Sequence, residues 1–292
     1  MPQKNQKNIN IAKGLFACYA FYMKIKLRWR LCALFASLVL LLCALAAWLY
    51  APKKLKPTFD VAYYWTTKQF DASPWLYREY ATGHKYFLYL PEKYRKDKDN
   101  ESAKLPLIVT FHGSMEQAKA ISYARPFISQ EFQRDIYPEG CAVLAVVARI
   151  GYFTDPHSMS LLIQNVLLQN KCIDQTNIVG WGFSQGAKYA VELACYEPHL
   201  FRGVISGSGF YQMSLKELLT VLPVNFYFAT SETDKGIFEQ GSPTGKRCAF
   251  WCRNSRYVQY KSRYHFHVEL KDKTGRGDET AFDWMKSVIN KK

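Results

Sequence analysis

The stretch that decides the fold runs from Asn177 to Ala194 and reads NIVGWGFSQGAKYAVELA. Its first six residues form a short, largely apolar run that predicts a buried strand. From Ala187 onward, apolar residues recur at positions i, i+3, i+4 and i+7, which predicts a helix with one buried face. Between them lies Gly182-Phe183-Ser184-Gln185-Gly186, a serine flanked by glycines at a tight turn. Such a turn pushes the hydroxyl out above the sheet, so Ser184 is a candidate nucleophile rather than an ordinary turn residue.

Other strand-like runs surround this unit. The continuous apolar run Cys141–Ala148 suits a strand buried on both faces of a parallel sheet. Further runs of this kind are Leu107–Phe111, Arg202–Ser206, Val224–Thr230 and Phe266–Leu270. The predicted fold class is therefore α/β, with a mostly parallel central sheet of about eight strands flanked by helices.

The two ends of this region carry their own patterns. Tyr77–Tyr80 and Lys85–Leu90 flank a short Gly-containing turn, which predicts a β-hairpin. Near the C-terminus a helical period returns, which predicts a final helix around Phe282, Met285, Val288 and Ile289.

The strand Leu107–Phe111 ends in His112-Gly113-Ser114. This turn resembles the oxyanion loop of lipases and esterases, in which backbone N–H groups face a developing carbonyl oxyanion. The predicted oxyanion donors are the N–H of Gln185 and that of either Ser114 or Met115, between which the residues do not choose. We expect a structural role for His112, because it precedes the turn that faces the substrate.

Together, the elbow, the His-Gly loop and the strand order resemble the α/β-hydrolase superfamily over residues 78–292. Within it, Tyr86-Phe87-Leu88-Tyr89-Leu90-Pro91, His112-Gly113-Ser114 and Cys172-Ile173-Asp174 are similar to secreted polyhydroxybutyrate depolymerases and feruloyl esterase-like enzymes. Those enzymes often carry a further Gly where this chain has Ala187. The resemblance implies a serine hydrolase that cleaves a small or polymer-linked carboxylic ester through an acyl-enzyme, without a metal or other cofactor.

The resemblance also implies that an acid and then a histidine follow the serine along the chain. Asp234, in the loop after Val224–Thr230, stands where the family places its acid, and Glu232 is the alternative. The expected position of the histidine holds Arg276. An arginine stays protonated and cannot accept the serine proton, so the usual triad is interrupted there.

Three other histidines of the chain could serve as the base. His265 and His267 fall near the middle or start of the predicted strand Phe266–Leu270, roughly a strand's length from the elbow. His157 follows the Cys141–Ala148 strand, at the correct end of the sheet. His157 and His267 are kept as candidates, and the absence of any catalytic histidine stays open. The alternative function is therefore a catalytically degenerate α/β-hydrolase-fold binding domain.

The N-terminal region differs in composition from the rest. We divide the chain into a basic segment 1–30, an apolar segment 31–50, an aromatic linker 51–76 and the hydrolase domain 77–292. Leu31–Tyr50 has no charged residue and spans about 30 Å as a helix, enough to cross a bilayer. The heavier basic flank precedes it, which favours a signal anchor, or a cleaved signal peptide, with the domain on the non-cytoplasmic side or secreted.

Charge and cysteine content limit the partners. Of the net charge of +15, the first 50 residues contribute seven basic and no acidic side chains, so the rest is only mildly basic and nucleic acid is not an expected partner. Cys248 and Cys252 lack the neighbours of a zinc site, and no metal is expected. Cys172 and Cys195 fall at the same end of the predicted sheet, which favours a disulfide between them.

We predict that the full chain fractionates with membranes, because the apolar segment is long enough to span one. A protease added to the non-cytoplasmic side should cut the C-terminal domain. A domain that is cut only from the cytoplasmic side contradicts the prediction.

Overall fold

The computed structural model describes residues 35–42, 69–70, 76–78, 83–102, 104–124, 140–260, 265 and 279–289. The chain divides into two compact units, Met1–Pro52 and Lys53–Lys292. In the first unit, residues 35–42 form a helix with exposed side chains. Among the described residues, no helix has both the length and the apolar character needed to span a membrane. Most of the predicted span 31–50 lies outside those residues.

The second unit is built on one sheet whose strands lie in the order β1-β2-β3-β5-β4-β6-β7-β8-β9. The strands are β1 (Gln69–Phe70), β2 (Leu76–Arg78), β3 (Lys85–Tyr89), β4 (Leu105–Phe111), β5 (Ala142–Val147), β6 (Ile173–Phe183), β7 (Gly203–Gly207), β8 (Asn225–Ser231) and β9 (Arg256–Tyr260). From β5 to β9 every neighbouring pair is parallel, which confirms the mostly parallel sheet. β3 is antiparallel to both β2 and β5, so the predicted hairpin is also confirmed.

The edge strand β9 is not among the predicted strands. The structure places β9 at Arg256–Tyr260, whereas the predicted strand Phe266–Leu270 lies outside the described residues. β9 pairs with β8 along its whole length, from Tyr227 opposite Arg256 to Ser231 opposite Tyr260. Its residues are mostly half-buried and include the polar Arg256 and Gln259, so this edge strand has no continuous apolar run to mark it.

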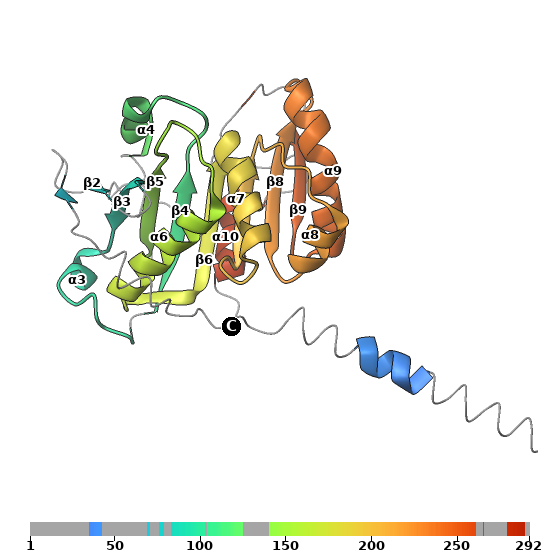
Figure 1. The fold of residues 1–292 in the computed structure, drawn as a ribbon, viewed down its shortest axis with the longest axis horizontal. Coiled ribbons are helices and arrows are strands. Elements are labelled where there is room, and N and C mark those ends of the chain that lie inside the picture. The colour runs from blue at the N-terminus through green and yellow to red at the C-terminus, as the bar shows by residue number, and fades with distance from the viewer. Residues whose placement is uncertain are drawn as a thin grey trace, which may run out of the picture. The chain divides into compact units, whose positions relative to one another are not determined.

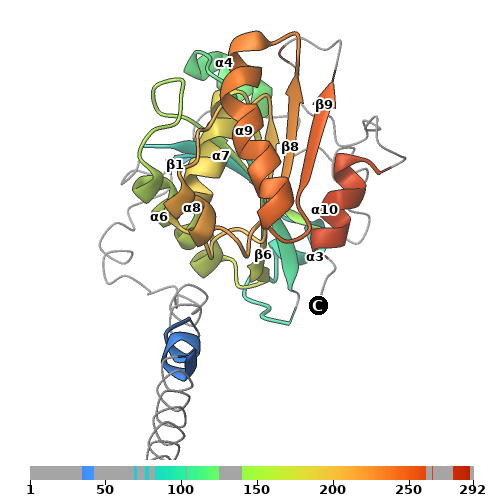
Figure 2. The same ribbon diagram turned by 90° about the vertical axis from the view of Figure 1, so that its right-hand side faces the viewer.

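Helices cover both faces of the sheet (Figures 1 and 2). They are α3 (Glu92–Arg95), α4 (Gln117–Ala124), α6 (Pro156–Gln169), α7 (Gln185–Tyr196), α8 (Leu215–Thr220), α9 (Lys235–Trp251) and α10 (Ala281–Ile289). α6, α7, α8 and α9 contribute to the larger core on one face, which includes Phe111, Tyr189 and Phe201. α10 packs on the other face around Trp284, and α4 covers that same face beside β5. This three-layer arrangement confirms the predicted α/β class.

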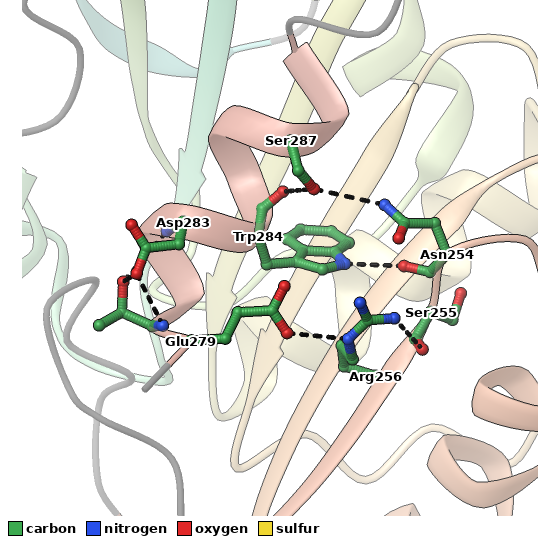
Figure 3. A network of polar contacts seen from close by, with 8 residues as sticks. Asn254, Ser255, Arg256, Glu279, Asp283, Trp284 and Ser287 are labelled. Atoms are coloured by element: carbon green, nitrogen blue, oxygen red, sulfur yellow. Dashed lines mark hydrogen bonds and ion pairs between the residues drawn. The ribbon is translucent and has the colours of Figure 1, made fainter. Parts of the chain in front are cut away.

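A polar network ties α10 to the start of β9 (Figure 3). The fully buried Trp284 ring donates its Nε1–H to the carbonyl of Asn254 at 2.8 Å. Beside it, Nε of Arg256 lies 2.9 Å from the Glu279 carboxylate. Asn254 has a φ of 51°, a left-handed conformation that Asn adopts more readily than most residues. The turn into β9 is therefore held in one position, and with it the direction in which β9 leaves.

The prediction of a disulfide between Cys172 and Cys195 is wrong, because both thiols are free. Cys172 lies in the turn before β6, where its N–H donates to the carbonyl of Lys98 at 2.9 Å. Cys195 lies near the end of α7, where its thiol interacts with the hydroxyl of Tyr211. The two cysteines thus pack against different segments, although each lies near the amino edge of the sheet.

Buried histidines make the stability of this unit depend on pH. Burial lowers the pKa of His84, which stacks on Phe153, to about 4. Both folded and unfolded chains hold this ring neutral at pH 7. As the pH falls below ~6.5, the unfolded chain binds a proton that the folded chain refuses until about pH 4, so stability falls with pH in that window.

We predict that His84 alone lowers the free energy of unfolding by about 3 kcal/mol between pH 7 and pH 4. His84→Gln should lose correspondingly less over that range in denaturant titrations, because its side chain does not titrate. His157→Gln, at an exposed histidine, is the matched control and should keep the wild-type slope. Equal slopes for wild type and His84→Gln would contradict the prediction.

Candidate active site

Ser184 sits at the strained turn between β6 and α7. Its φ of 54° and ψ of −119° are unusual for a residue with a side chain. A Cβ on Gly182 would lie 2.5 Å from the carbonyl carbon of Gly186, and a Cβ on Gly186 would overlap the carbonyls of Phe111 and His112. Only glycine fits at either position, so the two glycines are what allow the serine to turn out at the carboxyl end of β6.

The His-Gly loop after β4 lies directly against this serine. A Cβ on Gly113 would lie 3.3 Å from Cβ of Ser184. The buried His112 accepts the N–H of Ala148 at Nε2, at 2.9 Å, so its Nδ1 carries the proton that goes to the carbonyl of Gly113, at 2.6 Å. Burial lowers the pKa of His112. The neutral ring thus braces the loop, in agreement with the structural role expected for it.

The backbone hydrogen bonds show which of the two predicted oxyanion donors in this loop, Ser114 or Met115, is available. The N–H of Met115 donates to the carbonyl of Gly151 at 3.0 Å and is already occupied. The N–H of Ser114 has no partner among the residues that the structure describes. Gln185 opens α7, where N–H groups have no partner within the helix. The side chain of Gln185 bonds both the N–H and the carbonyl of Phe153, at 3.0 and 2.6 Å, which anchors this end of the helix.

Asp234 and His265 form a pair at the neighbouring strand ends. Asp234 stands at the N-cap of α9, just after β8, and its side chain is 9% exposed. Nδ1 of His265 lies 2.8 Å from Oδ2 of Asp234. Because a carboxylate can only accept, Nδ1 is the donor, and Nε2 is then the nitrogen that can take a proton. The geometry is that of a carboxylate that orients an imidazole.

This imidazole lies beside the serine turn. The ring of His265 is 5.2 Å from that of Phe183, the residue immediately before Ser184, at an interplanar angle of 55°. The sequence-based placement of His265 inside a strand, a strand's length from the elbow, is therefore wrong. Because β9 ends at Tyr260, His265 follows the last strand that the structure describes by five residues and lies at the carboxyl edge of the sheet.

The other predicted candidates fall elsewhere. His157 bonds the hydroxyl of Tyr196 at 3.1 Å, and Tyr196 is the last residue of α7, about three turns beyond Ser184. Glu232 accepts a hydrogen bond from Gln259 at the exposed edge of the sheet. His267 and Arg276 lie outside the described residues. Within the described part of the chain, no three His, Cys, Asp or Glu side chains gather as metal ligands.

Comparisons with known proteins agree with this architecture. A phospholipase/carboxylesterase family matches residues 156–226, which contain β6, the serine turn and α7. A thermostable esterase has a TM-score of 0.51 at 18% identity, over 74% of this chain and 59% of its own length. The chain has the α/β-hydrolase fold.

Two further structures share this fold. A ferulic acid esterase has a TM-score of 0.50 at 10% identity, over 68% of this chain and 90% of its own. A thermophilic carboxylesterase cloned from a metagenomic library has a TM-score of 0.50 at 14% identity, over 71% and 85%. No curated protein matches the chain. At these identities the likeness shows the α/β-hydrolase fold and nothing finer.

The position of His265 after β9 had a weak signal in the sequence. Arg256-Tyr257-Val258-Gln259-Tyr260 contains two tyrosines and a valine, residue types that are enriched in strands. With the last strand placed there, His265 becomes the first histidine after it. The stretch 266–270 is more apolar, and the prediction placed a strand there instead.

We predict that Gly186→Ala destabilises the α/β-hydrolase unit by about 2 kcal/mol or more, because the new methyl group overlaps the carbonyls of β4 and its loop. Gly236→Ala is the matched control, since nothing lies within 4 Å of a Cβ there. It should be neutral or stabilise by up to ~1 kcal/mol. Urea unfolding measures both, and a neutral Gly186→Ala would refute the close approach.

Proposed function

We propose that this protein is a serine hydrolase of carboxylic esters, with Ser184 as nucleophile, His265 as base and Asp234 as acid. The observation that carries the proposal is the 2.8 Å pair of His265 and Asp234 beside the serine turn. The α/β-hydrolase fold and the local match to phospholipases and carboxylesterases support it. The narrower resemblance to polyhydroxybutyrate depolymerases and feruloyl esterases stays a prediction.

The residues divide the chemistry as follows. Nε2 of His265 takes the proton of Ser184 as its oxygen attacks the ester carbonyl, while Asp234 holds the ring and stabilises its positive charge. The oxyanion that forms accepts hydrogen bonds from the N–H groups of Gln185 and Ser114. His265 then gives the proton to the leaving alcohol. A water molecule, activated by the same histidine, hydrolyses the acyl-enzyme.

The surroundings of the site suit this chemistry. The nearly buried Asp234 lies at the N-terminus of α9, whose dipole favours the negative charge of a carboxylate. The His265 side chain is 34% exposed, so substrate and water can reach the ring. The bond from the Gln185 side chain to Phe153 keeps the oxyanion N–H in place before substrate arrives, which avoids a reorganisation cost during the reaction.

The alternative function, a catalytically degenerate binding domain, is less well supported by the structure than by the sequence. That alternative rested on Arg276 standing in for the catalytic histidine, and His265 now supplies an imidazole paired with a carboxylate. We further propose that the apolar segment 31–50 keeps the enzyme at a membrane, with its active site on the non-cytoplasmic side, where it meets ester substrates.

We predict that Ser184→Ala abolishes ester hydrolysis and fluorophosphonate labelling with little change in thermal stability. His265→Ala should lower turnover to a similar degree, because residues of a triad act as one unit and their loss costs up to about 10⁶. His157→Ala, in the first turn of α6, where the ring bonds Tyr196 at the far end of α7, is the control and should keep activity. The rate at which each of the three variants hydrolyses p-nitrophenyl esters measures these effects.

A second pair of variants tests the acid. Asp234→Asn should reduce turnover by about 10⁴, as expected when the orienting carboxylate becomes an amide. Glu232→Gln, two residues earlier in the same loop, should leave it unchanged. Loss of activity in Glu232→Gln alone, or in His157→Ala alone, contradicts these assignments. Wild-type protein that ignores both fluorophosphonate and short-chain esters contradicts the proposed function.

A further inference from the structure

Large apolar side chains are exposed at the end of α9 and on the neighbouring α8. Phe250 and Trp251, in the last turn of α9, are 79% and 61% exposed. Their rings pack edge to face, with centroids 5.2 Å apart at an interplanar angle of 75°. Leu215 and Leu219, one turn apart on α8, are exposed as well. These four residues are called the α8–α9 patch below. The proposed ester hydrolysis uses none of them.

The end of α9 lies beside α8 (Figures 1 and 2). Met213, two residues before α8, accepts a hydrogen bond from the Arg247 guanidinium at its carbonyl. The N–H of Met213 donates to the hydroxyl of Thr244 at 3.1 Å. Trp251 follows Arg247 by one helical turn, so it stands on the same flank of α9, which faces the α8 segment. The apolar side chains of the two helices therefore belong to one surface.

The surroundings of the patch are basic. Segments 213–222 and 241–253 contain four basic residues and one acidic residue. The acidic residue, Glu217, accepts a hydrogen bond from the hydroxyl of Tyr211 at 2.6 Å. Three of the cations are exposed, and within the described part of the chain none of them has an ion-pair partner; they are Lys216, Lys246 and Arg253. The surface thus combines aromatic and aliphatic side chains with an excess of positive charge.

We propose that the α8–α9 patch rests on the surface of an anionic lipid bilayer. Trp, Phe and Leu side chains with Lys and Arg beside them are the combination that binds the interface of a membrane, because the apolar groups enter the headgroup region while the cations meet lipid phosphates. A second copy of the chain suits the patch less well. A symmetric contact between two copies would bring the cations of both together.

The rest of the chain can bring this surface to a bilayer. The apolar segment 31–50, proposed above to lie in the membrane, is joined to β1 by the 18 residues 51–68. A chain of that length spans at most about 60 Å. The patch therefore meets lipid at a high effective concentration, and a weak contact is enough to orient the domain.

The contact fixes which way the active site faces. α9 starts after Asp234, at the carboxyl edge of the sheet, and runs for 17 residues, about 25 Å, to the patch. With the patch on lipid, the Ser184 site lies on the far side of the domain from the bilayer. The substrate is then an ester that arrives from the aqueous side rather than a lipid of the same membrane. This last step rests on the proposed function, whereas the lipid contact does not.

Photocross-linking tests the proposal on the full chain, reconstituted into vesicles of phosphatidylcholine and phosphatidylglycerol. The photoreactive amino acid p-benzoylphenylalanine replaces Phe250 in one variant and Glu239 in the other. Glu239 is exposed and lies three turns earlier on the same face of α9, so it is the matched control. After irradiation we expect lipid adducts at position 250 and few or none at position 239. Thermal melting in detergent shows that both variants fold.

A third variant tests the role of charge. Lys216→Gln, Lys246→Gln and Arg253→Gln, combined with the photoreactive group at position 250, should lower the yield of lipid adducts about tenfold or more, because each basic residue adds attraction to an anionic surface. Vesicles of phosphatidylcholine alone should have the same effect on the unaltered cations. Adducts that do not depend on charge, that are equally abundant at position 239, or that join two copies of the chain in place of lipid overturn the proposal. Ester hydrolysis is measured in the same samples, so failure of one proposal leaves the other standing.

Discussion

The close approach of α7 to β4 at Gly186 is the constraint on which the rest of the structure depends. At this point the helix backbone lies against the carbonyls of Phe111 and His112, with no room for a side chain. The contact brings the end of β6 and the loop after β4 together. As a result, Ser184 and Gly113 touch although 71 residues separate them in the chain. The proposed nucleophile and the N–H groups proposed to stabilise its oxyanion are thus positioned by one backbone contact.

Neutral, buried polar groups keep that contact in register. His112 links Ala148, after β5, to the carbonyl of Gly113, and the Gln185 side chain links the start of α7 to Phe153. The bond from Ala148 to His112 and the bonds between Gln185 and Phe153 each join segments that follow two different strands. Because every such partner is satisfied inside the protein, the loops at this edge are held without relying on exposed ion pairs, which contribute little. Burial disfavours the charged form of the His112 ring and so lowers its pKa.

The contact between Asp234 and His265 depends on a second constraint, the parallel pairing of β8 with β9. Parallel strands end at the same edge, so the loops after Ser231 and Tyr260 emerge side by side. That pairing brings Asp234 to His265, and the network around Trp284 and Arg256 fixes where β9 begins. β9 is held by its backbone ladder with β8 and by packing against α9, where Tyr257 lies beside Gly245, so its side chains need not be strongly apolar.

Local physical chemistry explains which features were predictable from the sequence. The buried strands, the helix after Ser184 and the two glycines of its turn each follow from patterns within a dozen residues, because period, branching and backbone freedom are local properties. The N-terminal apolar run and the position of Asp234 after β8 were equally visible. These features determined the α/β class and indicated which serine lies at the strained turn after β6.

Tertiary structure alone decided the partner of Asp234 and which N–H in the loop after β4 has no partner among the described residues. Half-buried β9 carries a weak hydrophobic pattern, since sheet pairing rather than apolar burial holds it, so the prediction missed this strand, which precedes His265. The N–H of Met115 is excluded only by the carbonyl of Gly151, and Cys195 is separated from Cys172 only by how α7 packs. Such contacts join residues distant along the chain, and no local pattern encodes them.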